Sequence, residues 1–372
     1  MAVANELKKL DPSAQILFIG EKNGQFDHLL NGQRAIDQVY QVRAGKFRRY
    51  KGESWFKKLT DFKTNWLNFR DSFLVFAGIV QSIRLLRRNK PDIVFIKGGF
   101  VGVPVGLAAA MLKIPYITHD SDIISGLANR LIGRWASQHA VAMPAELYNF
   151  PPNKTHFVGI PLDNNYQLVS HDAKIGYRRD LNLEETKPVL FITGGSQGAQ
   201  RLNNAVAKIM PKLLAKIPEL KVLHQTGQNS DVYDLLPIEQ QSRVITFKFA
   251  KDLYRYSGAA DIVISRAGAT SIAEMAAQGK PSILVPNAEL TGGHQVKNAE
   301  FIASKKAALI ISEHRLISSP EVLVKAVEEL ITSPHKRAEL GENLHQISVP
   351  SAANSVAELI LNTSGKGSGL PR

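Results

Sequence analysis

Short apolar runs alternate with stretches of helical periodicity along nearly the whole chain. Runs such as VLFIT at 189–193 and DIVIS at 261–265 are dense in β-branched and apolar residues, which is typical of strands buried on both faces. The alternation predicts parallel sheets covered by helices on both faces, an α/β fold of the doubly wound kind. The predicted strands are residues 16–20, 37–42, 92–97, 115–119, 139–143 and 156–159, followed by 188–193, 221–225, 244–248, 261–265, 281–285 and 307–312.

The segment from Gly159 to Lys187 interrupts this alternation. It contains Pro161 and a charged helical run, and the strand–loop–helix pattern restarts after it. A chain of 372 residues is also long for one domain. We therefore expect two Rossmann-like domains facing a cleft, with a Gly/Ser-rich disordered tail at the end. Their ranges are 1–163 and 164–345, and the tail is 362–372.

Composition narrows the class of protein. The chain has no cysteine, which excludes disulfides and thiolate chemistry and favours a reducing compartment. It contains no run of about 18 apolar residues that could cross a bilayer. The formal net charge of +13 favours an anionic partner, which could be nucleic acid, a phosphorylated ligand or an acidic membrane face.

The strongest motif is FITGGSQGAQRLN at 191–203, in which an apolar strand runs through a glycine loop into a helix. Glycines permit a tight turn, and the helix start offers unsatisfied N–H groups and the positive end of a dipole. Gly195, Ser196, Gln197 and Gly198 are therefore candidates to cradle a phosphate or diphosphate. The loop is neither a Walker A sequence nor a complete GxGxxG, and from the local pattern an ordinary strand–helix turn explains it equally well.

Two further segments of the second half carry candidate ligand groups. In DIVISRAGATSIAEMAAQGK, Glu274 falls in the first turns of a helix. A carboxylate there either complements the helix dipole or accepts both hydroxyls of a ribose. In ELTGGHQVKNAEFI, a pair of glycines precedes His294 and Gln295, which either bind sugar hydroxyls or form the exposed start of a helix.

The first half has a polar cluster at the end of a strand. His119, Asp120 and Asp122 follow a second strand–glycine loop–helix, KGGFVGVPVGLAA at 97–109. A histidine and carboxylates at a strand end are candidates for a general base. The alternative is helix capping by Ser121 or Asp122. One histidine and two aspartates are a poor set of metal ligands, so we propose no structural metal.

Residues 48–90 interleave aromatic and basic side chains. An aromatic face ringed by lysine and arginine suits the surface of an anionic membrane. The same composition also fits a nucleic-acid platform, or a core helix with a solvated basic face, which we favour for much of 73–86. The candidate membrane-facing residues are Trp55, Phe56, Phe62, Trp66 and Phe69.

In their order along the chain, GGSQGA, SRAGATSIAE and GGHQVKNA resemble the donor half of the MurG family. Members of this family are peripheral membrane N-acetylglucosaminyltransferases with a GT-B fold. GGFVGVP and HDSDIISGLANR resemble the first-half loops of the family, usually GGY-x-SGP and HEQN-x-x-x-G-x-x-N. The resemblance extends to about residue 360, and it implies that a last helix within 346–361 crosses back onto the first domain.

The resemblance implies a donor site for UDP-N-acetylglucosamine in the second domain. The loop around Ser196 would hold the diphosphate, Glu274 the ribose, and Gln295 the transferred sugar. Phe249 and Ala250 would flank the uracil. The implied donor-binding residues are Asp122, Asp163, Gly195, Ser196, Gln197, Gly198, Phe249, Ala250, Ala269, Thr270, Ser271, Ile272, Ala273, Glu274, His294 and Gln295; Gly98, Gly99, Phe100 and Asn129 form an acceptor-side loop, and His119 and Asp120 are the catalytic candidates.

The implied reaction is an inverting transfer of N-acetylglucosamine to lipid I, a polyprenyl-pyrophosphate-linked muramyl-peptide, which gives lipid II for peptidoglycan synthesis. Charge growing on the departing diphosphate is what the protein must chiefly stabilise. The resemblance also implies an anionic membrane surface as a partner, at the cytoplasmic face of the plasma membrane, and no nucleic acid. We expect no tightly bound cofactor; a divalent cation is allowed, although no site for one is evident.

Two departures from the family pattern keep rival functions open. The HEQN of the family is HDSD at 119–122 here, and Asp163 stands where the family has an arginine that pairs with phosphate. The closest rival is another lipid-linked UDP-sugar glycosyltransferase of the same fold. A UDP-sugar 2-epimerase is less favoured.

The largest departure is at the opening of the chain. AVANELKKL at 2–10 matches a helix that in the family follows a first strand and a GGTGGH-type loop. The first strand of a doubly wound sheet is central, so its loss would leave unpaired backbone groups on its neighbours. We therefore expect an intact donor half, a gap in the acceptor half, and a start codon assigned too late. An in-frame stop codon immediately before Met1 would rule out the last expectation.

Overall fold

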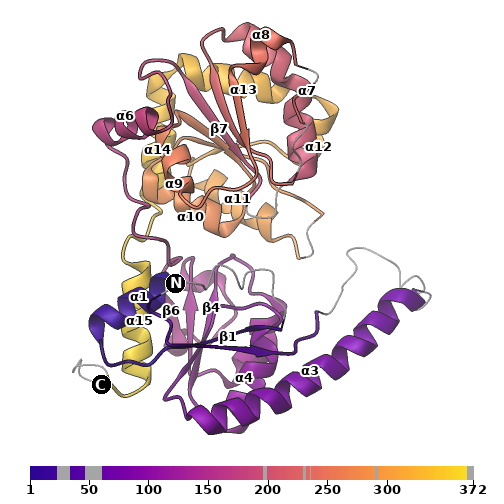
Figure 1. Ribbon diagram of the computed structural model, residues 1–372, viewed down its shortest axis with the longest axis vertical. Helices are drawn as coiled ribbons and strands as arrows, with labels where there is room; N and C mark the ends of the chain where they lie inside the picture. Colours follow the sequence, from indigo (N-terminus) through magenta and orange to yellow (C-terminus); the bar gives the residue numbers. More distant parts are fainter. Residues whose placement is uncertain are drawn as a thin grey trace. The chain divides into compact units, whose positions relative to one another are not determined.

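The computed structural model describes residues 1–22, 34–46, 61–195, 199–228, 232–234, 236–289 and 292–366, without the side chains of Phe62 and Lys63. They form two compact units (Figure 1), of which one is Met1–Asp163 with Ser351–Arg372 and the other Asn164–Pro350. Both units are built on parallel strands with helices packed against them, so the predicted fold class is confirmed.

The first unit holds two parallel sheets. The smaller contains β1 (Leu17–Glu21) and β2 (Gln38–Val42), and the larger runs in the order β3 (Val94–Ile96), β4 (Tyr116–Asp120), β5 (Gln138–Val141) and β6 (Thr155–Phe157). The helices are α1 (Ala2–Leu10), α3 (Phe62–Asn89), α4 (Gly102–Met111), α5 (Leu127–Ile132) and α15 (Ala352–Thr363), with short 3₁₀ turns at Gly133–Trp135, Ala145–Leu147 and Pro152–Lys154. Residues of α1 and α15 share one core cluster, and residues of α3 and α4 share another.

The second unit is one parallel sheet of six strands in the order β12-β11-β10-β7-β8-β9. The strands are β7 (Val189–Thr193), β8 (Lys221–Gln225), β9 (Val244–Phe247), β10 (Ile262–Ser265), β11 (Ser282–Leu284) and β12 (Leu309–Ile310). The helices are α6 (His171–Asp180), α7 (Gln200–Lys216), α8 (Ile238–Gln241), α9 (Leu253–Ala259), α10 (Ala269–Gln278), α11 (His294–Ser304), α12 (Glu313–Ser318), α13 (Glu321–Thr332) and α14 (Pro334–His345). This is the strand order of a dinucleotide-binding fold, whose winding reverses between β7 and β10.

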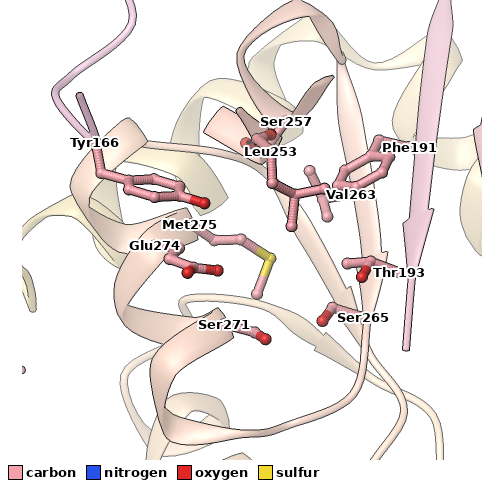
Figure 2. A pocket seen from close by; sticks show the side chains of 10 residues that line it. All are labelled: Tyr166, Phe191, Thr193, Leu253, Ser257, Val263, Ser265, Ser271, Glu274 and Met275. Atoms are coloured by element: carbon pink, nitrogen blue, oxygen red, sulfur yellow. Dashed lines mark hydrogen bonds between the residues drawn. The ribbon is translucent and has the colours of Figure 1, made fainter. Parts of the chain in front are cut away.

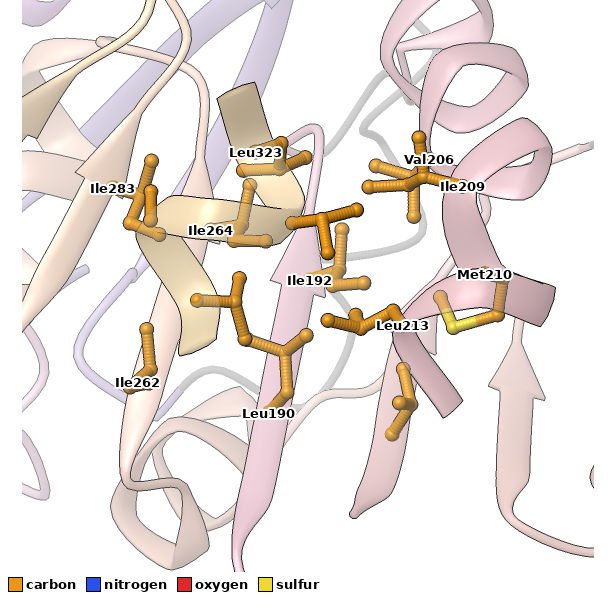
Figure 3. Close-up of a cluster of buried hydrophobic side chains, with 14 of the residues drawn as sticks. Leu190, Ile192, Val206, Ile209, Met210, Leu213, Ile262, Ile264, Ile283 and Leu323 are labelled. Carbon is orange, nitrogen blue, oxygen red and sulfur yellow. The ribbon is translucent and has the colours of Figure 1, made fainter. Parts of the chain in front are cut away.

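Strand β7 shows why the apolar runs are continuous. All five of its residues are buried. Leu190 and Ile192 point into a cluster formed with α7 and α13 (Figure 3), whereas Val189 and Phe191 belong to the cluster on the other face of the sheet. Because successive side chains of a strand point to opposite faces, a strand covered on both faces is apolar along nearly its whole length, and in β7 the buried polar residue is Thr193 at its end.

All the predicted strands are present, with ends shifted by no more than two residues. One helix boundary was wrong: α15 continues to Thr363, so Asn362 and Thr363 are helical rather than the start of a disordered tail. Val356, Leu359 and Ile360 of α15 pack in a core cluster of the first unit, and the helix extends one turn beyond the last strand-facing residues to Thr363. Residues 367–372 lie outside the described part of the chain.

The prediction of a core helix for much of 73–86 was right only for its later part. Ser82 and Leu86 are buried, but Phe73 and Phe76 are exposed. The cause is the side of the helix on which these residues lie. The buried side of α3 contains Asp71, Gly78, Ser82 and Leu86, with Gly78 against Pro104 of α4. Phe73 and Phe76 project about 120° to 180° away from Gly78 and Ser82.

Candidate active site

The glycine loop of the second unit lies at the carboxyl end of β7, where the winding of the sheet reverses. Gly195 has φ +82°, a backbone conformation that favours glycine. Helix α7 begins at Gln200, directly after the loop. Ser196, Gln197 and Gly198, the predicted diphosphate residues, lie outside the described part of the chain.

Glu274 lies on α10, at the same edge of the sheet. It is the sixth residue of that helix, well beyond the first turn, so complementing the helix dipole does not explain it. Figure 2 shows its carboxylate beside Ser271 and the ring of Tyr166. These residues line a cavity of about 10 Å³, close to the smallest space that holds one water molecule.

The other residues predicted on α10 divide into packing and surface positions. Ala269 and Ile272 are buried and Thr270 is exposed, while Ala273 is partly buried. Tyr166, in contrast, was missed from the sequence. Its only signal is a single aromatic residue in a polar stretch that follows the first unit.

Gln295 is tied into the loop before it. Gly292 and Gly293 have φ +92° and +67°, and α11 begins immediately afterwards at His294. The side-chain oxygen Oε1 of Gln295 accepts a hydrogen bond from the backbone N–H of Asn287 at 2.9 Å. The helix start is therefore more than an exposed end, and the amide group of Gln295 can donate to a ligand.

Three more residues lie in or beside the loops at this edge of the second unit. Phe249 is exposed in the loop that follows β9, with Ala250 beside it. Asn298 of α11 is fully buried, and its amide donates to the carbonyl of Ala267 at 3.1 Å. That bond joins α11 to the loop after β10, a link that the sequence motif did not reveal.

The first unit contains a cavity of about 170 Å³ at the carboxyl ends of β3 and β4. Gly98 and Gly99 turn the chain there with φ +88° and +82°. The structure brings together most of the residues predicted for this region. The lining residues are Lys97, Gly98, Gly99, His119, Asp120, Ser121, Asp122, Ile124, Gly126 and Asn129, so Phe100 is the predicted residue that does not line it.

His119 is buried and uncharged at neutral pH. Its Nε2 lies 2.9 Å from the carbonyl oxygen of Gly159. A carbonyl can only accept, so Nε2 carries the hydrogen and Nδ1 holds a lone pair. Nδ1 is buried and has no hydrogen-bond partner among the described residues. Burial lowers the pKa of His119 to about 4, assisted by the nearby charge of Lys97.

Asp120, the last residue of β4, bonds the chain at the start of the next helix, where the sequence predicts capping by Ser121 or Asp122. Its Oδ1 accepts a hydrogen bond from the backbone N–H of Gly126 at 3.0 Å, at the start of α5. No side chain of Ser121 or Asp122 caps that helix, so the capping interpretation of these two residues was wrong. Asn129 donates to the carbonyl of His119 at 2.9 Å and so links α5 to β4.

Comparisons with known proteins identify the family. The models of the glycosyltransferase family 28 N-terminal and C-terminal domains match residues 1–141 and 189–356. The chain is 35% identical to the UDP-N-acetylglucosamine–N-acetylmuramyl-(pentapeptide) pyrophosphoryl-undecaprenol N-acetylglucosamine transferase of Clostridium perfringens strain SM101, over 89% of this chain and 85% of that protein. The chain belongs to the MurG family. The resemblance of its motifs is thereby confirmed, and the protein is a glycosyltransferase.

Solved structures agree with a GT-B fold. A crystal structure of Acinetobacter baumannii MurG matches with a TM-score of 0.68 at 24% identity, over 97% of this chain and 94% of that one. A UDP-GlcNAc 2-epimerase from Neisseria meningitidis bound to UDP-GlcNAc matches with a TM-score of 0.66 at 15% identity, over 97% and 95% of the two chains. The second likeness shows that epimerases share this fold.

The remaining predicted residues of this MurG-family chain are Asp163 and the candidate membrane-facing residues. Asp163 is exposed at the end of the first unit. Trp55 and Phe56, and the side chain of Phe62, lie outside the described residues. Within the described ranges, no helix is both long and apolar enough to span a membrane.

The described part of α3 has an exposed aromatic stripe, consisting of Trp66, Phe69, Phe73 and Phe76. The four side chains are between 57% and 68% exposed. Their spacing of three and four residues places them on one side of the helix. Phe69 and Phe73 meet edge to face with ring centroids 4.9 Å apart, so the rings contact one another as well as solvent.

Proposed function

We propose that this protein transfers N-acetylglucosamine from UDP-N-acetylglucosamine to the muramyl sugar of undecaprenyl-pyrophosphoryl-muramyl-pentapeptide, converting lipid I to lipid II. The observation that carries the proposal is the similarity to relatives named for this reaction, which covers both units. It is supported by two unlike sites at carboxyl strand ends: a glycine loop with a carboxylate in the second unit, and a larger polar cavity in the first.

The second unit would bind the donor. The N–H groups at the start of α7 and the dipole of that helix would stabilise the negative diphosphate, as they do at other helix starts. Glu274 would accept hydrogen bonds from the ribose hydroxyls, and the amide of Gln295 would donate to the transferred sugar, with His294 beside it. Phe249 and Ala250 would lie beside the uracil.

The first unit would bind the acceptor and remove its proton. The acceptor hydroxyl attacks the anomeric carbon, the bond from that carbon to the diphosphate oxygen breaks, and UDP leaves with the negative charge. We assign the proton to the carboxylate of Asp120. The lowered pKa of His119, about 4, keeps its imidazole neutral, so we assign to His119 the role of accepting a hydrogen bond at Nδ1.

The aromatic stripe of α3 would place this chemistry at an anionic membrane, on its cytoplasmic face. One turn of a helix takes about 3.6 residues, so Arg84, Arg87 and Arg88 project within about 60° of the direction of Trp66. All three arginines are exposed. Apolar rings followed by arginines along one side of a helix suit the boundary between acyl chains and anionic headgroups, and we propose a membrane rather than nucleic acid as the anionic partner.

The reaction is tested by incubating the protein with UDP-N-acetylglucosamine in the presence and absence of lipid I. Release of UDP that requires lipid I, together with formation of a disaccharide lipid, is the expected result. Free UDP-sugar epimerised at C2 would instead establish an epimerase. Transfer to other polyprenyl-linked sugars but not to lipid I would establish the rival acceptor. Parallel assays with EDTA and with Mg²⁺ measure any contribution of a divalent cation.

The membrane surface is tested by sedimentation with vesicles that contain about one third anionic lipid. Replacing Trp66 and Phe73 together by serine is expected to weaken binding at least about tenfold, because two large apolar side chains no longer insert. Ile238→Ser is the control, since Ile238 is 83% exposed but lies on α8 of the second unit. Equal binding by the double variant and the control would show that the stripe does not dock on membranes.

A further inference from the structure

The carboxyl end of β8 carries polar side chains that the reaction does not use. His224, Gln225 and Thr226 are almost completely buried there, beside the largely apolar core of the sheet. Buried polar groups need hydrogen-bond partners, and an apolar residue would fill the same space without that requirement. Each of these three residues has a hydrogen-bond partner in the chain on one side or the other of the glycine loop.

One set of bonds starts at the loop itself. The backbone N–H of Gly195 donates to Thr193 Oγ1 at 3.1 Å, and Thr193 Oγ1 donates to Gln225 Oε1 at 2.7 Å. The hydroxyl thus accepts one bond and donates the other, which fixes its rotation. Thr193 and Gln225 are direct neighbours on β7 and β8. The second glycine of the loop is therefore held to β8 through a single buried hydroxyl.

A second set of bonds holds the helix that follows the loop. Asn203, in the first turn of α7, is fully buried and donates to the carbonyl of Thr226 at 2.9 Å. Its Oδ1 lies 3.2 Å from His224 Nε2 and can only accept, so Nε2 carries the hydrogen. His224 Nδ1 must then accept from the hydroxyl of Tyr233, 2.7 Å away. Burial lowers the pKa of His224 to about 3, which keeps this neutral arrangement in place.

The two sets of bonds act on opposite faces of the sheet. Ile192, the neighbour of His224, packs in the cluster that contains α7. Thr193 and Gln225 follow these residues along their strands, so they point to the other face, where Thr193 lines the cavity with Glu274. Strand β8 therefore holds the loop at both ends, through Gly195 before it and through α7 after it.

We propose that Thr193 and Gln225, supported by Asn203, are positioning residues for the diphosphate of the donor. They touch no ligand; they fix Gly195 and the first turn of α7 relative to the sheet, so that the N–H group of Gly195 and those of the first turn of α7 are available to the phosphates without reorganisation. Fixed dipoles stabilise charge more effectively than dipoles that must first reorient. This inference rests on the proposed donor site.

The test is the dissociation constant of UDP, measured by titration calorimetry on the full chain. Thr193→Val keeps the shape of the side chain and removes the hydroxyl, and we expect UDP to bind about tenfold more weakly. Thr193→Ser restores the hydroxyl and should return the affinity to nearly that of the unaltered protein. Gln225→Met, which removes the acceptor, should behave like Thr193→Val. In steady state, KM for UDP-N-acetylglucosamine should rise and KM for the lipid acceptor should not.

Ser282→Ala is the matched control. Ser282 is a fully buried strand residue of the same sheet, and its hydroxyl donates to the carbonyl of Lys280 rather than to the loop. A comparable loss of melting temperature in Ser282→Ala and Thr193→Val, with weaker UDP binding only in the latter, supports the inference. Unchanged UDP affinity in Thr193→Val and Gln225→Met overturns it while leaving the proposed function intact. Failure of the unaltered protein to bind UDP overturns both.

Discussion

Strands β1 and β7 are alike in sequence and unlike in burial. LFIGE in the first unit and VLFIT in the second are both apolar runs next to a glycine. Every residue of β7 is buried, whereas no residue of β1 is more than partly buried. Strand β7 has β8 and β10 as neighbours; β1 pairs with β2, and its other edge has no strand partner among the described residues.

The difference teaches that an apolar run predicts a strand but not how well that strand is covered. Burial of β7 comes from helices on both faces and strands on both sides; α7 and β8 follow it directly, whereas β10 and α13 come from later parts of the chain. The same contrast holds for the two sites. The chain on both sides of the glycine loop of the second unit is held by buried hydrogen bonds, while the first-unit cavity contains an imidazole nitrogen that is buried and has no partner in the described part of the chain. The first of these sites is fixed by hydrogen bonds within the protein, whereas in the second His119 Nδ1 can still accept one from a ligand.

The largest expected effect separates the two sites by chemistry. Asp120→Asn should lower kcat about a thousandfold, because the amide still accepts the hydrogen bond from Gly126 but cannot take the proton. The dissociation constant of UDP should not change, because UDP is assigned to the other unit. Asp92→Asn, which removes an exposed carboxylate paired with Lys366, is the control. A kcat within threefold of the unaltered value would remove Asp120 from the mechanism.

The next effect compares a phenylalanine on β7 with one on β1. Phe191 is 1% exposed in the core of the second unit, and its replacement by alanine should cost about 3 to 5 kcal/mol of unfolding free energy. Phe18 on β1 is only partly buried, and Phe18→Ala should cost about 1 to 2 kcal/mol. Denaturant titrations followed by circular dichroism measure both. Equal costs would contradict the contrast between the two sheets.

Acid should destabilise the first unit before the second. Burial lowers the pKa of His119 and of His139 to about 4, and that of His224 in the second unit to about 3. Unfolded histidine binds its proton near pH 6.5, so each depressed group contributes stability above that pH and loses it as the pH falls towards the folded pKa. Lowering the pH from 7 to 4 should reduce the free energy of unfolding by as much as about 3 kcal/mol for each of these histidines. Burial also lowers the pKa of His156, so the first unit contains three histidines with a lowered pKa and the second contains one, among the described residues.

The tryptophans make this experiment selective. Trp55, Trp66 and Trp135 all belong to the range of the first unit, so tryptophan fluorescence follows that unit alone, while circular dichroism follows both. At pH 5 the fluorescence transition should come at a lower temperature than the dichroism transition. His139→Gln, which removes one titrating group, should reduce the gap. Coincident transitions at every pH would show that the two units respond to acid equally.

The fold was largely predictable because strands that are buried on both faces appear in the sequence as nearly continuous apolar runs. Residues that line the two cavities were predictable where glycine and charge mark them, as at Gly98 and Gly99 in a loop and at Glu274 on α10. What failed depends on distant partners. The exposure of Phe73 and Phe76 depends on which side of α3 packs against its neighbours, and nothing in the sequence near Gln225 shows that its side chain meets Thr193.

The smallest of these effects returns to the donor site. Glu274→Gln keeps the size of the side chain but replaces a charged acceptor of two hydroxyls by a neutral amide, and a hydrogen bond to a charged group contributes about 1.5 to 3 kcal/mol. We therefore expect KM for UDP-N-acetylglucosamine and the dissociation constant of UDP to rise about thirtyfold. Glu328→Gln, an exposed carboxylate on α13 that pairs with Lys216, should change neither. If Glu274 binds ribose, kcat at saturating donor should fall much less than in Asp120→Asn, since the ribose does not take part in bond breaking. A fall in kcat with unchanged donor affinity would instead assign Glu274 to the chemistry, and the division of labour between the two units would have to be redrawn.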